Sequence, residues 1–303
     1  MKRLLAGLIV TLGACGGTTT TEAPRPSAAL REESCAGCHP AEAAEWRGSM
    51  HRASFTSPDF QRSYRAEPRD YCASCHAPLP DVTAGIGCTS CHAATQQHAT
   101  AQAHATTRAC GSCHDFDVPG TRTALQTTER EHRASAFAAT TCDGCHMPRA
   151  GTRRDHRFAV SRDRDVLARA IRVHDARVER DEIVVAVASQ GVGHRFPTGD
   201  LYRRVTVTVT AYAGDALVGG GTFYLQRDVD EHRESLVARR PERPDTDTRL
   251  DDTPRDLRIA CVRPPGRVHV TVEYERGLGG AGNELEAFER LDLFDADVAI
   301  ATR

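Results

Sequence analysis

One short pattern, Cys-x-x-Cys-His, occurs five times between residues 35 and 146 and uses ten of the twelve cysteines of this 303-residue chain. Two cysteines three positions apart on one helical turn point the same way, so both thiols can bond to one planar group. The adjacent histidine can then offer an imidazole nitrogen to a metal at the centre of that group. This is the attachment pattern of c-type haem. We therefore expect five covalently attached haems, at Cys35-Ala-Gly-Cys38-His39, Cys72-Ala-Ser-Cys75-His76, Cys88-Thr-Ser-Cys91-His92, Cys110-Gly-Ser-Cys113-His114 and Cys142-Asp-Gly-Cys145-His146.

Two other uses of so many cysteines compete with haem attachment. An exported protein could pair them as disulfides, and Cys-x-x-Cys pairs closed by histidines could bind zinc. Neither alternative explains why histidine follows the second cysteine in every copy. We therefore favour haem thioethers, with the five motif histidines as iron ligands.

The N-terminus indicates export. Residues 1–14 combine a basic start with a short apolar core, as in a signal peptide, and that core is too short for a permanent membrane span. Residues 12–15, Leu-Gly-Ala-Cys, resemble a bacterial lipoprotein cleavage box, which implies a lipid on Cys15; the alternative is an ordinary leader that contains a cysteine. Residues 15–33 are rich in Gly, Thr, Pro, Ser and Ala and favour a flexible tether.

These features place the chain at the cell envelope. Acyl chains on Cys15 would anchor it to a membrane surface, and haem attachment takes place outside the bacterial cytoplasm. Gly16 and Gly17 provide no acidic retention-type residue after the lipid site. We therefore expect a protein on the periplasmic face of the outer membrane.

Two further domains are expected, giving a multidomain α plus β fold. Residues 34–160 predict a pentahaem cytochrome domain that is haem-packed and mostly helix and loop. From residue 165 onward the motifs stop and period-2 alternation begins, which predicts an antiparallel β-sandwich over residues 165–303. Short helices are expected over residues 41–50, 60–67 and 128–138, with the rest of the haem domain irregular. Residues 284–300 fit either a helix or a strand.

Composition supports this interpretation and excludes others. The hydrophobic content is 40% and aromatics are only 5%, which is little apolar material for a chain of this length unless haem rings supply part of the interior. The formal charge is −2, and arginines are interleaved with acids along the chain. That pattern is typical of a solvated surface and excludes a nucleic-acid partner. The only lysine is Lys2, so the mature chain has no lysine to bind iron.

Histidine is the expected second ligand of the irons. There are fourteen histidines, of which five belong to the motifs, whereas the methionines other than Met1 are only Met50 and Met147. Met147 directly follows a motif histidine and cannot reach the opposite face of that haem. The irons are therefore expected to be low-spin and bound mostly by two histidines, a combination with lower potentials than histidine and methionine.

The segment Trp46-Arg-Gly-Ser-Met-His51 follows the first motif closely. It resembles a segment of the tetrahaem cytochromes of ammonia oxidisers and related multihaem proteins, including hydroxylamine oxidoreductases and pentahaem nitrite reductases. The resemblance implies that His51 is an axial ligand. Glu131-His132 before the fifth motif looks like a second copy, and Asp155-His156 resembles a familiar multihaem ending, so His132 and His156 are implied as ligands too. The pentahaem nitrite reductases use a lysine ligand, which this chain lacks.

Three more histidines are candidate ligands. His98 and His104 lie in a linker of Ala, Thr and Gln between the third and fourth motifs, and at least one is expected to bind iron. His194 lies in a Gly-His-Arg-Phe-Pro-Thr-Gly loop, similar to loops of β domains fused to multihaem cytochromes. Our hypothesis is that the β domain offers His194 to an iron or covers a haem edge; the alternative is a turn built from Gly and Pro.

The remaining candidates are interpreted as structural. His174 and His269 fall on the polar faces of expected strands, and His232 lies in a charged loop. Cys261 is expected to be a small buried residue rather than a reactive thiol.

The leading functional hypothesis is a carrier of electrons between redox partner proteins by haem-to-haem transfer. The alternative is a reductase or oxidase of a small inorganic nitrogen or sulfur species at one five-coordinate haem. A third hypothesis gives the β domain the task of binding a partner protein. The sequence does not name the donor or the acceptor.

Overall fold

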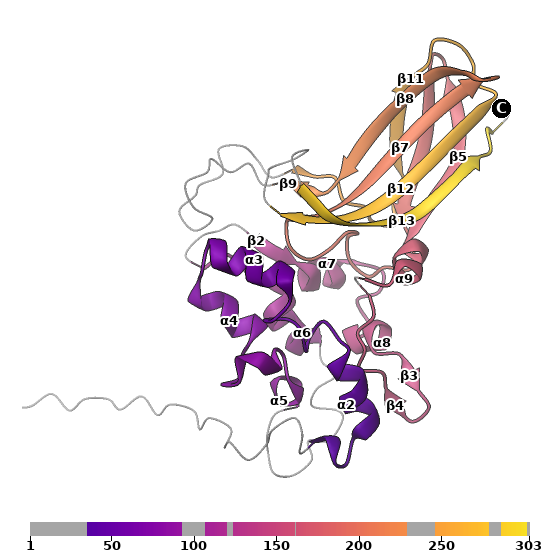
Figure 1. The fold of residues 1–303 in the computed structure, drawn as a ribbon. Coiled ribbons are helices and arrows are strands. Elements are labelled where there is room, and N and C mark those ends of the chain that lie inside the picture. Colours follow the sequence, from indigo (N-terminus) through magenta and orange to yellow (C-terminus); the bar gives the residue numbers. More distant parts are fainter. Residues whose placement is uncertain are drawn as a thin grey trace, which may run out of the picture.

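The computed structural model describes residues 35–92, 107–119, 124–160, 162–228, 246–278 and 286–301. Its first half is a group of short helices and its second half is built from long strands (Figure 1). The helices are α2 (Pro40–Arg47), α3 (Pro58–Ala66), α4 (Asp70–His76), the 3-10 turn η1 (Val82–Ala84), α5 (Cys88–Cys91), α6 (Thr107–His114), α7 (Thr128–Ala134), α8 (Cys142–His146) and α9 (Arg164–Arg169).

The helices start where the sequence supplies the right residues. Proline begins α2 and α3, a position where its missing N–H costs nothing. The side chain of Ser57 accepts a hydrogen bond from the N–H of Phe60 at the start of α3, as an N-cap does. The helices expected over residues 41–50, 60–67 and 128–138 are confirmed as α2, α3 and α7, each with a shift at its ends.

The long strands form two antiparallel sheets. One has the order β11-β6-β5 and the other β13-β12-β7-β8. Their strands are β5 (Ile171–Glu179), β6 (Glu182–Ser189), β7 (Arg203–Ala213), β8 (Ala216–Leu225), β11 (Arg255–Ala260), β12 (Arg267–Leu278) and β13 (Glu286–Val298). The last of these settles the segment that fitted either helix or strand: it is a strand.

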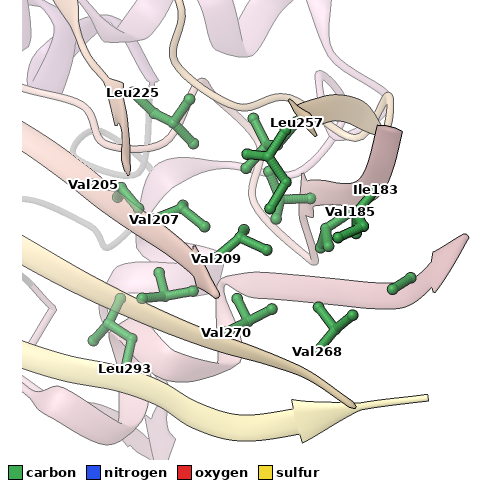
Figure 2. Close-up of a cluster of buried hydrophobic side chains, with 14 of the residues drawn as sticks. Ile183, Val185, Val205, Val207, Val209, Leu225, Leu257, Val268, Val270 and Leu293 are labelled. Carbon is green, nitrogen blue, oxygen red and sulfur yellow. The ribbon is translucent and has the colours of Figure 1, made fainter. Parts of the chain in front are cut away.

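Alternation of side chains builds the core between these sheets (Figure 2). In β7 the valines at every second position are buried, and they lie opposite the buried valines of β12, with Val207 beside Val272 and Val209 beside Val270. Ile183 of β6 and Leu257 of β11 belong to the same cluster. Both sheets thus contribute one face to a single apolar core, as period 2 requires. Cys261 is also buried there, at 8% exposure.

The expected fold class, a haem-packed and mostly helix-and-loop domain followed by a β-sandwich, is wrong. Strands account for 39% and helices for 26%. Even the segment with the motifs contains strands, in the pairs β1 (Asp115–Asp117) with β2 (Ala124–Thr127) and β3 (Arg149–Ala150) with β4 (Arg153–Arg154). We expected these segments to be irregular. They pair because backbone groups near the motifs still need hydrogen-bond partners, which the expectation of a haem scaffold overlooked.

One more strand pair, β9 (Arg227–Asp228) with β10 (Thr246–Asp247), lies where the sheets approach the helices (Figure 1).

Among the described helices none has the length and apolar character needed to cross a bilayer.

Candidate haem-binding sites

The motif cysteines are placed on single helical turns. Four motifs coincide with α4, α5, α6 and α8. The first motif makes the same turn, since the N–H of His39 bonds to the carbonyl of Cys35 at 2.8 Å. None of these ten cysteines, all within the described residues, is joined in a disulfide. Each pair is therefore arranged to react with one flat group.

The motifs are also gathered in space around α6, which lies among the other motif helices (Figure 1). Cys113 of α6 interacts with Cys75 of α4, and Cys110 of α6 interacts with Cys142 of α8. Cys91 of α5 is close enough to Cys113 for its pKa to be raised by that neighbour, after the larger effect of burial. The fourth motif is thus the neighbour of the second, third and fifth.

Three motif histidines each face a second histidine from elsewhere in the chain. The ring centres are 6.3 Å apart for His114 and His51, 6.2 Å for His92 and His156, and 6.1 Å for His146 and His194. A bond from a metal to an imidazole nitrogen is about 2 Å long and a nitrogen lies about 1.1 Å from its ring centre, so two imidazoles on opposite sides of one metal have centres about 6 Å apart. All three pairs have this spacing.

Backbone carbonyls orient several of these rings. Nδ1 of His156 lies 2.9 Å from the carbonyl of Arg154, and Nδ1 of His194 lies 3.0 Å from that of Arg195. Nδ1 of His76 lies 3.0 Å from the carbonyl of Ser54. A hydrogen bond of this kind leaves the lone pair on Nε2, the tautomer that binds a metal.

Burial favours the neutral form of four of the six facing histidines. It lowers the pKa of His51 to about 4, helped by the nearby His114 and His146. The pKa of His146 is also lowered to about 4, by burial first and then by His194, His114 and His132. Burial lowers the pKa of His114 and His194 as well. Neutral imidazole is the form that binds iron, so the side chains fit haem iron held by two histidines.

Phe158 connects two of the pairs. Its ring centre lies 4.3 Å from that of His51 and 6.2 Å from that of His156, edge to face in both cases. Its φ of 49° is unusual for a residue with a side chain, which indicates that the surrounding packing holds it there. Sequence reasoning missed Phe158, and only its position two residues after His156 pointed to it.

The other candidate ligands have different surroundings. His76 packs against Phe60, with ring centres 4.0 Å apart. His132 of α7 is buried at 8% exposure, and no partner for its Nδ1 is found in the described part of the chain. Its ring lies against Gly193, beside the loop of His194. His98, His104 and Cys15 lie outside the described residues.

His269 has surroundings that differ from those of the candidate iron ligands. Its two ring nitrogens each lie 3.0 Å from a carboxylate, of Asp297 and Asp295, so neither is available to a metal. Within the described residues, no three His, Cys, Asp or Glu side chains converge as metal ligands. The Cys-x-x-Cys pairs there are therefore not collected into tetrahedral zinc sets.

Comparison with known proteins places the fold. No protein-family model and no curated protein matches the chain. Among solved structures, it is similar to the crystal structure of a penta-haem cytochrome c552 from Thermochromatium tepidum, with a TM-score of 0.70 and 18% sequence identity over 88% of this chain and 98% of that one. This chain therefore shares the fold of that penta-haem cytochrome over nearly its whole length.

Proposed function

We propose that the chain is a pentahaem c-type cytochrome that carries electrons between redox partners at the bacterial cell envelope by haem-to-haem transfer. The observation that carries this proposal is the set of three imidazole pairs, each containing one motif histidine, at the spacing of two ligands on one iron. Haem c supplies a reversible one-electron couple. The chain's own residues fix the ligands, exclude water from them and keep the motifs close together.

The clustering of motifs around α6 supports transfer within the chain. Electron exchange needs neighbouring groups near contact, and the cysteines of α6 interact with those of two other motifs. The three histidine pairs also favour a carrier over an enzyme, because an iron held by two histidines has no open position for a substrate. The shared fold with a penta-haem cytochrome is in keeping with this role.

One contact favours the alternative of a reductase for a small nitrogen or sulfur species. His76 packs against the ring of Phe60, whereas the three paired motif histidines face another imidazole. If none of His98, His104 and His132 ligates it, the haem on Cys72 and Cys75 would have an open position.

Spectroscopy of the holoprotein distinguishes the two functions. A carrier is expected to give low-spin signals only, no shift on adding nitrite or hydroxylamine, and rapid electron exchange with small redox proteins. A high-spin signal from one haem, together with turnover of nitrite, hydroxylamine or a sulfur oxyanion, would overturn the carrier proposal.

The location is part of the same proposal. The signal peptide over residues 1–14, the lipid on Cys15 and the tether over residues 15–33 together predict a protein anchored on the periplasmic face of the outer membrane, with residues 34–160 and 165–303 as its two domains. Membrane fractionation before and after changing Cys15 to Ser tests it. Release of the holoprotein into the soluble periplasm is the expected result, and retention on the membrane would contradict it.

A further inference from the structure

Two of the facing histidines are carried by loops, and each loop is held by a glutamate on a helix. The N–H of His156 donates to Oε2 of Glu45 at 2.9 Å. The N–H of Arg195, directly after His194, donates to Oε2 of Glu131 at 3.1 Å. Glu45 belongs to α2 and Glu131 to α7, both far from these loops in the sequence.

An arginine completes each contact. Arg153, in β4 and three residues before His156, binds Glu45 through two bonds of 2.7 Å, a bidentate arrangement with strict geometry. These hydrogen bonds, first from Arg153 and then from the His156 N–H, hold the pKa of Glu45 below its ordinary value.

At the second loop the arginine comes from another segment of the strand-rich half. Arg249 lies 2.5 Å from Oε1 of Glu131 and 2.7 Å from Asp247, and it also donates to the carbonyl of Pro197 at 3.4 Å. The loop is further joined to α7 by a hydrogen bond of 2.7 Å between the hydroxyls of Thr128 and Thr198. Arg249 is only 5% exposed, so this ion pair is shielded from solvent and salt.

His51 is held without a carboxylate. Its carbonyl accepts the N–H of Ile86 at 2.9 Å, and Trp46 donates to the carbonyl of Ile86 at 2.8 Å. The pair of His51 and His114 therefore serves as an internal control for experiments on the glutamates that hold the other two pairs.

We propose that Glu45 and Glu131 are positioning residues that set the orientation of His156 and His194 toward the irons they share with His92 and His146. Each imidazole takes its orientation from a backbone carbonyl within two residues. The position of that backbone is in turn fixed by the hydrogen bond from a loop N–H to the glutamate. Residues that orient a metal ligand in this way tune the metal as well as its affinity. This inference rests on the proposed function, since it presumes iron at these sites.

The test uses the full-length holoprotein with Glu45→Gln or Glu131→Gln. Glutamine keeps the size of the side chain but loses the charge that binds arginine. The EPR signals of the low-spin haems are recorded at low temperature, and each haem is followed in a redox titration. We expect each variant to change the low-spin signal and the midpoint potential of one haem, a different haem in each variant, and the double variant to show both changes.

Matched control variants distinguish an effect on the position of the histidine ligand from the general effect of losing one negative charge. Glu42→Gln makes the same charge change on α2, and Glu182→Gln makes it at another arginine-paired glutamate, on β6. Glu42→Gln should leave the low-spin signals as in the parent, and so should Glu182→Gln, where Glu182 pairs with Arg258 on the exposed face of the sheet. Unchanged signals in Glu45→Gln and Glu131→Gln, or equal changes in the controls, would overturn the inference. If instead the parent contains no covalent haem, the proposed function itself fails, so the two failures are distinguishable.

Discussion

His146 and His194 face each other with ring centres 6.1 Å apart and ring planes within 10°. One closes the fifth Cys-x-x-Cys-His motif and the other lies in a loop between two long strands. A single iron bound by both would join the helical half of the chain to the strand-rich half. The domain that appears accessory in the sequence would then complete a redox site.

The first prediction concerns this ligand directly. His194→Ala removes one of two imidazoles, so one haem should become high-spin while the others stay low-spin. EPR of the oxidised holoprotein measures the fraction of each. His269→Ala is the matched control, because both nitrogens of His269 already face carboxylates. A low-spin spectrum identical to that of the parent would show that His194 is not a ligand.

Close packing beside this loop leads to the second prediction. A Cβ placed on Gly193 would lie 3.0 Å from Cδ2 of His132 and 3.0 Å from Cβ of Phe137, closer than ordinary contact. Gly193→Ala should therefore displace the loop and broaden or shift the low-spin signal that His194→Ala abolishes. Gly266→Ala has space, with its nearest atom at 4.0 Å, and should leave the spectrum unchanged. Equal effects of the two substitutions would refute the packing argument.

Local signals in the sequence were sufficient for the attachment turns and the long strands, but not for the short strand pairs β1–β2 and β3–β4. Five repeated motifs define the attachment turns, and the alternation of valines around Val207 and Val270 defines the strands and their buried faces. These are patterns of neighbours in the chain, and they need no knowledge of distant contacts. The scarcity of methionine likewise predicts that most irons are bound by two histidines.

The sequence could not predict which motif histidine each of the other histidines faces. His156 faces His92 rather than the motif nearest to it, and that choice depends on how α2 and a hairpin pack together through Glu45. His132 lies in a segment that resembles a ligand segment. The contact that the structure shows there is made by its neighbour Glu131, which binds the N–H of Arg195. No sequence pattern distinguishes these two glutamates from Glu42 and Glu129 on the same helices, because their function arises only from tertiary contacts.

The third prediction counts the cofactors. The holoprotein should carry five haems by intact mass and by pyridine haemochrome absorbance. Changing Cys142 and Cys145 to Ser should remove one haem, whereas Cys261→Ser should remove none, because that thiol is outside the motifs and buried in the sheet core. Loss of a haem in the Cys261 variant would contradict the assignment.

The fourth prediction concerns the core between the sheets. Val207 is fully buried, and its replacement by Ala removes two buried carbons and leaves a cavity, at a cost of about 2–3 kcal/mol in the free energy of unfolding. Val262 is 87% exposed, and its replacement by Ala should lower the free energy of unfolding by about 0.5 kcal/mol or less. Chemical denaturation followed by far-UV circular dichroism measures both. A similar loss in the two variants would show that the core argument is wrong.

The fifth prediction is a pH dependence on the outer face of the three-stranded sheet. Hydrogen bonds from Arg177 and then Arg258 lower the pKa of Glu179 from 4.5 to about 2. A lowered pKa in the folded state means that the ionised carboxylate stabilises the fold at pH values above 4.5, and that this contribution is lost as the pH falls through about 2.

Comparing the unfolding midpoints of Glu179→Gln and the parent at pH 7 and at pH 2 tests this sign. The parent should be slightly more stable at pH 7, since exposed pairs contribute little, and the difference should vanish at pH 2. The exposed Val262→Ala variant changes no titratable group and should show no such dependence. A difference that grows toward acid would refute the prediction.

The contact of the His194 loop with α7 has a thermodynamic consequence. If docking of the strand-rich half and ligation of one iron are the same event, their free energies are linked and the coupling is reciprocal. A change at the iron that strengthens its bond to imidazole then tightens the attachment of the sheets, and a partner that pulls the sheets away weakens that bond by the same amount. Electron transfer and the mechanics of the two halves would form one coupled equilibrium.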